Sequence, residues 1–383
     1  MKIFGLQENL KQALAAVSHV AGKNVNLPIL NNILIKAEDG KIRLIATNLE
    51  IGVISTVRGK IEQEGSFTVN AKILSDCINL LPNKKVGLNQ KDSDLLLDCE
   101  NFQSKVRGQS AEEFPLIPEV DRSFYFSAPA AEIKNAITQV IFATASSETR
   151  LELSGVLFVF SANALTVAAT DSYRLAEKKI KIKAKTENEE EKRIIIPAKT
   201  LQELLRILSV NQAEETEEAA SEINFYISDN QALFTYGSTE LVSRLIEGQY
   251  PDYQQIIPAV GKTKISIDRL ELIRAVKMAA LFSKTGINDI NLDFPLGKNE
   301  VVISSISGQV GENITNLPAK TSGEENSIVV NCRYLLEGLS TIEAETVKIE
   351  VIDGNTPCVI RPDLPAQAGQ ASDYLYIIMP IKQ

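Results

Sequence analysis

Several residue types are scarce in this 383-residue chain, and their scarcity excludes whole classes of site. His19 is its one histidine, so H-E-x-x-H zinc sites and other multi-histidine metal sites are impossible. The four cysteines stand far apart without a C-x-x-C pair, which argues against a zinc knuckle or a disulfide framework. We expect no metal, and we expect His19 to lie on a helix surface or at a helix end.

The chain also lacks the motifs of nucleotide and acyl-transfer chemistry. Neither G-x-x-x-x-G-K-[ST] nor G-x-G-x-x-G occurs, and no serine sits in a G-x-S-x-G elbow. No apolar run is long enough for a membrane span or a signal peptide, so the cytoplasm is the expected compartment. A net charge of −9 argues against gripping nucleic acid by bulk charge alone. Composition therefore argues against metal or nucleotide chemistry and favours a binding role, and we expect no cofactor and no membrane partner.

Two motifs each occur three times along the chain. The first is a short strand followed by a helix with apolar residues at i, i+3, i+4 and i+7, which marks an amphipathic helix. It starts near residues 3, 124 and 265. The second is a β-branched run, then Asn or Pro, a small residue and a cation at the start of a helix. It spans residues 66–72, 193–199 and 327–333.

The second motif predicts how its helices begin. Asn70 and Asn331 are expected to be N-caps, and Pro197 suits a first helical turn. Together the motifs predict six helices, over residues 8–19, 71–81, 131–142, 198–209, 268–282 and 331–340.

The repeat length of about 125–135 residues predicts three tandem domains of an α+β fold. Pro-rich stretches at 113–118 and 249–258 read as extended connectors between them. We place the domains at residues 1–121, 122–258 and 259–383, each with two helices on one face of β-sheets.

Five further segments carry a family resemblance. They are Leu27–Asn32, Glu148–Val156, Ala169–Ala176, Tyr250–Tyr253 and Ile377–Ile381. In this order, on a threefold repeat, they resemble the bacterial DNA polymerase III beta subunit, the sliding clamp family, over essentially the whole chain.

The resemblance implies a non-catalytic processivity factor. Two three-domain chains would close head to tail into a six-domain ring around duplex DNA, bound without regard to sequence. Twelve inward helices at spacings of roughly 9–10 Å give a circle near 35 Å across, and subtracting about 10 Å for helix thickness leaves a hole of about 25 Å. The implied partners are the DNA polymerase III alpha subunit, a clamp loader, and other polymerases and repair proteins that carry short peptide motifs.

Charge placement agrees with inward-facing helices. The six helix windows contain nine cations and seven anions, a charge of +2, which leaves −11 for the rest of the chain. Weak contacts between such cations and phosphates would carry no base information and would allow sliding.

The resemblance also implies a peptide-docking groove between the second and third domains. Its lining would be Leu153, Thr170, Ser172, Tyr173, Arg174, Leu175, Pro251, Gln255, Ile256, Ile287, Asn331, Tyr334, Pro357, Ile377, Ile378, Met379, Pro380 and Ile381. Met379 would adapt its shape to a ligand, and Arg174 would supply donors at the rim. An alternative assigns Leu153, Leu175 and Ile377 to the core. Many family members have a basic residue at Gln255 and histidine at Tyr173, so motif preference is open.

Two more surfaces follow from the resemblance. The DNA-facing positions would be Lys23, Asn24, Lys72, Ser147, Leu151 and Lys199, each of which is otherwise a solvated surface residue. Other members place Arg, Gln or Tyr at Asn24, Ser147 and Leu151. The ring-closing interface would pair the edge strand around Ser104 and Val106 with the region of Leu281 and Phe282 in a second copy. Phe282 as an ordinary core residue is the alternative.

Two rival functions remain at this point. One is a three-domain enzyme with an interdomain site built from carboxylates and Arg174. The other is a repeat-built adaptor that never encircles DNA and stays a monomer. The sequence shows no acid–base or metal constellation, which favours a clamp over the enzyme.

Overall fold

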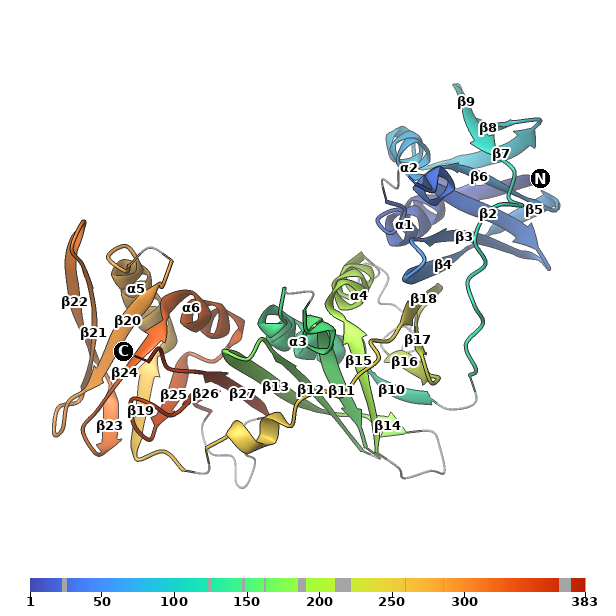
Figure 1. The fold of residues 1–383 in the computed structure, drawn as a ribbon. Helices are drawn as coiled ribbons and strands as arrows, with labels where there is room; N and C mark the ends of the chain where they lie inside the picture. The colour runs from blue at the N-terminus through green and yellow to red at the C-terminus, as the bar shows by residue number, and fades with distance from the viewer. Residues whose placement is uncertain are drawn as a thin grey trace. The chain divides into compact units, whose positions relative to one another are not determined.

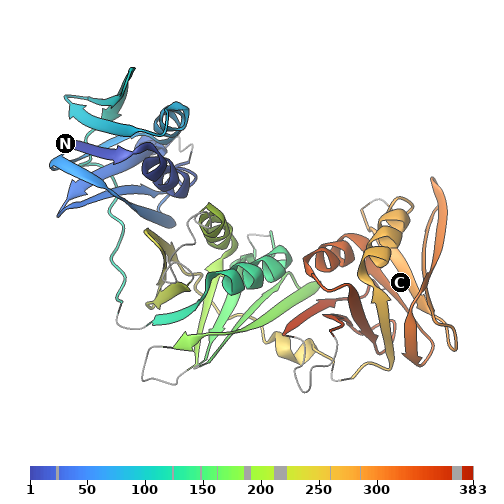
Figure 2. The ribbon, with the colours of Figure 1, turned by 180° about the vertical axis from the view of Figure 1, so that it is seen from behind.

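The computed structural model describes residues 1–22, 26–122, 125–146, 149–161, 163–184, 191–210, 222–258, 260–284, 286–364 and 373–382 (Figures 1 and 2). They form two compact units. Unit 1 comprises Met1–Lys134, Ile182–Glu190 and Lys199–Ile246, and unit 2 comprises Asn135–Lys181, Glu191–Ala198 and Glu247–Gln383. The predicted domain bounds remain a prediction, because the two units divide the middle third of the chain between them.

Unit 1 is built on a 14-stranded sheet with the order β14-β10-β16-β17-β18-β4-β3-β2-β6-β9-β8-β7-β1-β5. Its helices are α1 (Gln7–Val17), α2 (Ala71–Leu80) and all but the first residue of α4 (Ala198–Val210), and η1 (Pro28–Asn31) is a 3-10 turn. Its strands are β1 (Lys2–Leu6), β2 (Asn32–Glu38), β3 (Lys41–Thr47), β4 (Ile51–Val57), β5 (Gly59–Gln63), β6 (Gly65–Asn70), β7 (Lys85–Lys91), β8 (Asp94–Cys99), β9 (Phe102–Gln109), β10 (Tyr125–Pro129), β14 (Lys183–Ala184), β16 (Glu222–Ile227), β17 (Gln231–Tyr236) and β18 (Thr239–Arg244).

Unit 2 contains a nine-stranded sheet, β15-β11-β12-β13-β27-β26-β25-β19-β23, and a four-stranded sheet, β22-β21-β20-β24. Its helical elements are most of α3 (Ala130–Val140), α5 (Arg269–Ala280), α6 (Cys332–Thr341), η2 (Ile141–Ala143), η3 (Leu151–Ser154) and η6 (Tyr253–Ile256). Its strands are β11 (Gly155–Phe160), β12 (Ala164–Thr170), β13 (Arg174–Lys181), β15 (Lys192–Pro197), β19 (Thr263–Asp268), β20 (Asp289–Phe294), β21 (Glu300–Ser307), β22 (Gly311–Pro318), β23 (Lys320–Gly323), β24 (Asn326–Asn331), β25 (Thr346–Val351), β26 (Cys358–Pro362) and β27 (Tyr374–Ile378).

The six predicted helices are confirmed to within two residues at each end. Their apolar stripes are buried, as in α1, where Leu10, Leu14 and Val17 lie in the core. The Asn70 side chain accepts a hydrogen bond from the Ile73 amide, which confirms the predicted N-cap.

Pro197 does not enter the first turn of α4, contrary to the prediction. It is the last residue of β15, where it pairs with Gly155, and the helix starts one residue later. A proline at the end of a strand loses no ladder hydrogen bond inside the sheet, so the strand extends to the helix without a linker.

Helices lie in pairs over the sheets. α1 packs against α2 and against β3 and β4 in unit 1, and α5 packs against α6 and against β20–β22 in unit 2. Figures 1 and 2 show both pairs side by side. This arrangement buries the stripe of each helix against strands of its own unit, which confirms the predicted α+β architecture.

Candidate functional site

A tight turn before β13 provides one wall of the candidate groove. Thr170 Oγ1 donates to Arg174 O at 2.6 Å and accepts from the Ser172 amide at 3.1 Å. Asp171 Oδ1 accepts from the amides of Tyr173 and Arg174 at 2.9 and 3.0 Å. The turn places Ser172 at a φ of 78° and leaves the Tyr173 side chain exposed.

The C-terminal strand closes on this turn. β27 pairs with β13 in antiparallel register, with Ile378 opposite Arg174. Beyond the strand, the Met379 amide donates to Tyr173 O at 2.8 Å and the Ile381 amide donates to Val329 O at 2.8 Å. These two hydrogen bonds hold the half-buried residues Met379 to Ile381 in an extended tail between the turn and β24.

Arg174 connects three elements of unit 2. Its side chain is almost fully buried, and its Nε donates to Asp171 Oδ2 at 2.9 Å, its Nη2 to Phe142 O at 2.7 Å and its Nη1 to the Glu337 carboxylate. The guanidinium lies 4.5 Å from the centroid of the Tyr334 ring.

These contacts use three of the five N–H donors of the Arg174 guanidinium. Burial would lower its pKa, but the hydrogen bond to Glu337 and the charge of Asp171 raise the pKa above its ordinary value. Most of the donors assigned to the rim from the sequence are thus engaged within the protein.

The connector before η6 packs on the same turn through two tyrosines. Tyr250 Oη accepts from the Thr170 amide at 3.0 Å, and Tyr253 Oη donates to Glu177 Oε2 at 2.5 Å. Burial raises the pKa of both phenols well above the ordinary value, so both hydroxyls remain neutral at physiological pH. Pro251, between them, is half-buried.

The far wall belongs to α6 and its neighbours. Asn331 caps α6 by accepting from the amides of Arg333 and Tyr334 at 2.9 and 3.3 Å, which confirms the predicted cap. Its Nδ2 donates to Ile287 O at 3.2 Å. Pro357 directly precedes the residue of β26 that pairs with Ile378 of β27.

The groove candidates therefore divide by exposure. The buried ones form a floor and include the three for which a core role was the alternative; they are Leu153, Thr170, Arg174, Leu175, Ile377 and Ile378. The half-buried ones are Pro251, Asn331, Tyr334, Pro357, Met379, Pro380 and Ile381. The exposed ones are Ser172, Tyr173, Gln255, Ile256 and Ile287. The Gln255 side chain donates to Asp252 at 2.8 Å rather than to another candidate.

The DNA-facing candidates are placed only in part. Lys72 and Lys199 are exposed in the first turns of α2 and α4, and Leu151 is exposed in η3. Lys23, Asn24 and Ser147 lie outside the described residues.

Three of the nine cations counted in the helices have structural roles. Arg206 donates to the carbonyls of Ala15 and Ala16 at the end of α1, and Arg269 donates to Ala344 O at 2.9 Å. Arg274 forms an ion pair with Glu271. The positive charge available to a phosphate is smaller than the sequence count suggested.

The single histidine lies just beyond the end of α1. His19 Nδ1 is 2.8 Å from Oε2 of the buried Glu203 on α4, and its ring is largely exposed. Its position at a helix end is confirmed. Across the described ranges, no three or more His, Cys, Asp or Glu side chains cluster as metal ligands would, and no helix there is long and apolar enough to cross a membrane.

Within the described ranges, one edge of the predicted interface strand is unpaired over most of its length. β9 pairs with β8 along its length but with β6 only through Gly108 and Gln109. Ser104 is exposed, Val106 is buried, Leu281 is exposed just after α5 and Phe282 is half-buried.

Several exposed apolar side chains on the same two units were missed in the sequence. Ile73 and Leu80 lie on α2 and Phe102 on β9 in unit 1, while Ile306 and Ile314 lie on β21 and β22 in unit 2. A second apolar stripe on residues 71–80, outside the core stripe, was the signal that could have revealed Ile73 and Leu80.

Three family models match the chain in order. They describe the N-terminal, central and C-terminal domains of the DNA polymerase III beta subunit, over residues 1–118, 128–252 and 254–382. Three such domains in tandem confirm the predicted fold.

Relatives match over the full length. A beta sliding clamp of Synechococcus elongatus is 30% identical over 385 residues, which covers 100% of this chain and 99% of the relative. A DNA polymerase sliding clamp from Bacillus subtilis has a TM-score of 0.90 at 26% identity, covering 100% of this chain and 99% of that one. A sliding clamp from Pseudomonas aeruginosa bound to griselimycin has a TM-score of 0.90 at 25% identity, covering 100% of both chains.

Proposed function

Because the chain belongs to the DNA polymerase III beta subunit family, we propose that two copies close into a ring around duplex DNA and dock partner proteins in the groove described above. The chain is a non-catalytic processivity factor that works with DNA and a DNA polymerase. Membership of a bacterial replication family implies that the chain works in the cytoplasm, and we propose that it associates there with the nucleoid.

One observation carries the docking proposal. The tail from Met379 to Ile381 is held by hydrogen bonds to Tyr173 O and Val329 O, so its half-buried apolar residues have a fixed backbone position. An ordered apolar surface of this kind suits the apolar anchors of a short peptide, because little side-chain freedom is lost on binding. Tyr173 and Gln255 at the rim would then adjust which motifs are preferred.

The partners we propose for the groove are the DNA polymerase III alpha subunit, the clamp loader, other DNA polymerases and repair proteins. Holding a polymerase beside its template raises its effective concentration there. The test is binding of a labelled peptide of the Gln-Leu-x-Leu-Phe type to the full chain, to a chain lacking residues 379–383, and to Ile256→Ala. Leu296→Ala, an exposed apolar residue outside the groove, is the matched control.

Saturable binding that the truncation abolishes and the control keeps would support the groove. If the folded dimer binds no peptide, the docking proposal is wrong and only the ring-closing proposal stands. A folded monomer that binds no peptide would favour the adaptor alternative.

The ring-closing proposal rests on two apolar surfaces and a free strand edge. The open edge of β9 lies in unit 1, and the exposed Leu281 lies in unit 2. An open strand edge is able to pair with a strand of another chain, and an exposed apolar side chain can be buried by the same contact. We expect a particle of about 84 kDa, twice the chain mass of 42.0 kDa, in analytical ultracentrifugation. Leu281→Glu should give monomers, whereas Leu116→Glu, at a fully exposed position in the connector, should not.

The DNA-facing proposal predicts weak, salt-dependent binding to phosphates. Lys72 and Lys199 begin two helices of one unit, and removing a lysine that binds one phosphate should lower the slope of log affinity against log salt by about one. Lys72→Ala and Lys199→Ala should show this decrease on nicked circular duplex DNA. Lys60→Ala, an exposed lysine on β5, should retain the slope, and an equal decrease there would refute the assignment.

A further inference from the structure

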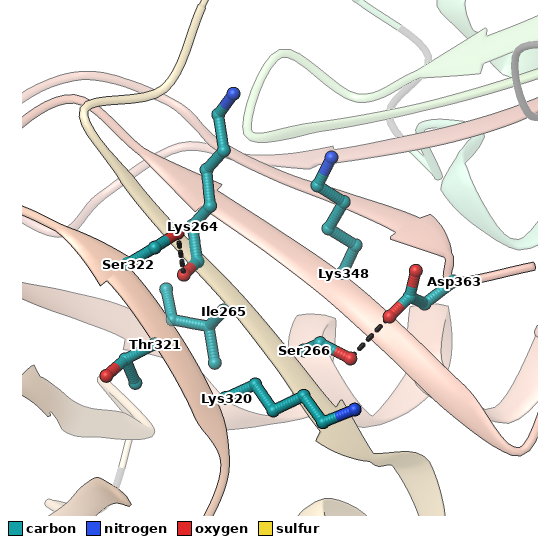
Figure 3. A pocket seen from close by; sticks show the side chains of 8 residues that line it. All are labelled: Lys264, Ile265, Ser266, Lys320, Thr321, Ser322, Lys348 and Asp363. Atoms are coloured by element: carbon teal, nitrogen blue, oxygen red, sulfur yellow. Dashed lines mark hydrogen bonds between the residues drawn. The ribbon is translucent and has the colours of Figure 1, made fainter. Parts of the chain in front are cut away.

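A cavity of about 340 Å³ lies on the solvent face of β19, β23 and β25 in unit 2 (Figure 3). These strands carry none of the groove, interface or DNA-facing residues. Lys264, Lys320 and Lys348 line the cavity, together with the hydroxyl groups of Ser266 and Ser322. Three lysines around one cavity are unusual in a chain whose net charge is −9.

Strand register explains why the lysines gather there. Ser266 of β19 pairs with Lys320 of β23 on one side and with Lys348 of β25 on the other. Neighbouring strands lie about 4.8 Å apart, so the backbones of the two lysines are about 10 Å apart, with Ser266 between them. Lys264 stands two residues before Ser266 on the same face of β19.

The charges of this face are incompletely compensated. Glu350 lies 3.2 Å from Lys348 and 3.5 Å from Arg361, and Arg361 pairs directly opposite Lys348. Glu350 also stands directly opposite Lys264 in the register of β19 and β25, so one carboxylate faces three cations here. Among the described residues, no carboxylate lies within ion-pair distance of Lys264 or Lys320. Like charges on neighbouring strands repel, and an anion between them would relieve the repulsion.

One carboxylate faces the cavity and limits which anion fits. The Ser266 hydroxyl donates to Asp363 Oδ2, which leaves Oδ1 able to accept a second proton donor. Figure 3 shows Lys264 and Lys348 extending in one direction and Lys320 on the other side of Ser266, with Asp363 beside Ser266. An ionised carboxylate only accepts hydrogen bonds, so a bound oxyanion must donate one to it.

We propose that this cavity binds an inorganic phosphate anion that carries a P–OH group. Its ionised oxygens take hydrogen bonds from Lys264, Lys320 and Lys348, and its P–OH donates to Asp363. Hydrogen phosphate and pyrophosphate both carry such a proton at neutral pH. Sulfate and a fully ionised phosphate monoester do not, so the site rejects them.

The experiment is isothermal titration calorimetry on the full-length chain at pH 7.5, with phosphate, pyrophosphate, sulfate and methyl phosphate in turn. We expect phosphate or pyrophosphate to bind and the other two anions to bind at least about tenfold more weakly, since a hydrogen bond to a charged group is worth that much. The relative affinities of phosphate and pyrophosphate identify which of the two the cavity fits.

Variants separate a specific site from general attraction. Lys320→Ala and Lys264→Ala should weaken phosphate binding about tenfold each. Lys262→Ala, which removes an exposed lysine just outside the cavity, should change little. Asp363→Asn should remove the selectivity by letting sulfate bind as well as phosphate.

Two results would overturn the proposal. One is equal binding of phosphate and sulfate by the natural chain, which needs no variant to fold. The other is an equal loss of affinity in Lys262→Ala and Lys320→Ala. Thermal unfolding without anions checks that each variant retains its fold.

Discussion

The turn before β4 and the turn before β13 share one hydrogen-bond pattern. Thr47 in the first and Thr170 in the second donate Oγ1 to the carbonyl four residues later, at 2.9 and 2.6 Å. Each also accepts from the amide two residues later, at 3.0 and 3.1 Å. The third residue of each turn, Leu49 in the first and Ser172 in the second, has a φ value of 77° and 78°, respectively.

The strand that pairs with the strand after each turn also makes a matching hydrogen bond to the turn. β18 pairs with β4, and the Arg244 amide then donates to Glu50 O at 3.1 Å. β27 pairs with β13, and the Met379 amide donates to Tyr173 O at 2.8 Å. The same backbone geometry therefore occurs twice, once in each unit. We call the turn at residues 47–51 with β18 the first junction, and the turn at residues 170–174 with β27 the second junction.

The two junctions differ in what covers them. At the first, the connector residue Ile117 packs where a side chain on Gly52 would stand, and Val120 is buried with Leu233 and Val242. At the second, Ile256 remains exposed.

At the first junction the connector packs over Gly52 through Ile117, whereas at the second it packs on the turn through Tyr250 and leaves Ile256 exposed. Different side chains on the same backbone geometry therefore give the two junctions different surfaces.

The largest expected effect comes from making the second junction resemble the first. Ile51 occupies the position of Arg174, so Arg174→Ile replaces a buried guanidinium and leaves Asp171 without its partner. We expect a loss of about 3 kcal/mol in urea unfolding, because removing one partner of a buried charge pair is costly. Arg150→Ile, which breaks an exposed pair near the same turn, should cost less than about 1 kcal/mol. Similar losses of stability in both variants would contradict the connecting role of Arg174.

The next effect concerns the helix that packs beside the second junction. A Cβ on Gly338 would lie 2.1 Å from the Tyr376 ring, whose hydroxyl donates to Tyr334 O at 2.7 Å. Gly338→Ala should therefore lower stability by about 2 kcal/mol through overpacking, seen as a lower Tm. Ser340→Ala, at an exposed position of the same helix, is the control. An unchanged Tm in Gly338→Ala would show that the ring can move.

A reciprocal pair of variants tests the difference between the surfaces of the two junctions. Ile117→Ala should cost about 2 kcal/mol in unfolding, because it leaves a cavity over Gly52, and should not change peptide binding. Ile256→Ala should cost little stability and weaken peptide binding several-fold, about 1 kcal/mol. The prediction fails if both variants affect the same measurement.

The smallest effect tests the likeness of the two turns. Leu49 and Ser172 both have left-handed backbone conformations, which asparagine adopts more readily than either. Leu49→Asn and Ser172→Asn should each stabilise the chain by about 0.5 kcal/mol in chemical denaturation. A gain at one position and a loss at the other would mean that the turns differ in strain.

The local features of the chain were predictable. The apolar period of the helices and the caps at Asn70 and Asn331 depend on residues within one or two turns of each other, so they could be read without a structure. The groove residues followed from the family resemblance and remain a prediction; the structure places Met379 and Ile378 next to the turn that carries Tyr173.

Contacts between distant segments were not predictable. Arg174 is paired with Glu337, 163 residues away, whereas its role at the rim was predicted from the family resemblance and the donor chemistry of arginine. The lysines around Ser266 come from three strands whose register no local pattern reveals. The exposure of Ile73 and Leu80 on α2 likewise depends on which faces the sheet leaves uncovered.

The amino-acid order was sufficient for the helices, their starts, the threefold repeat and the family, because each rests on spacing along the chain. The folded structure decided which side chains cover each of the two like junctions and which charges are paired. These depend on side chains that meet across sheets, such as Ile117 over Gly52 and Arg174 beside Glu337, and strand pairing between distant segments is what brings them together.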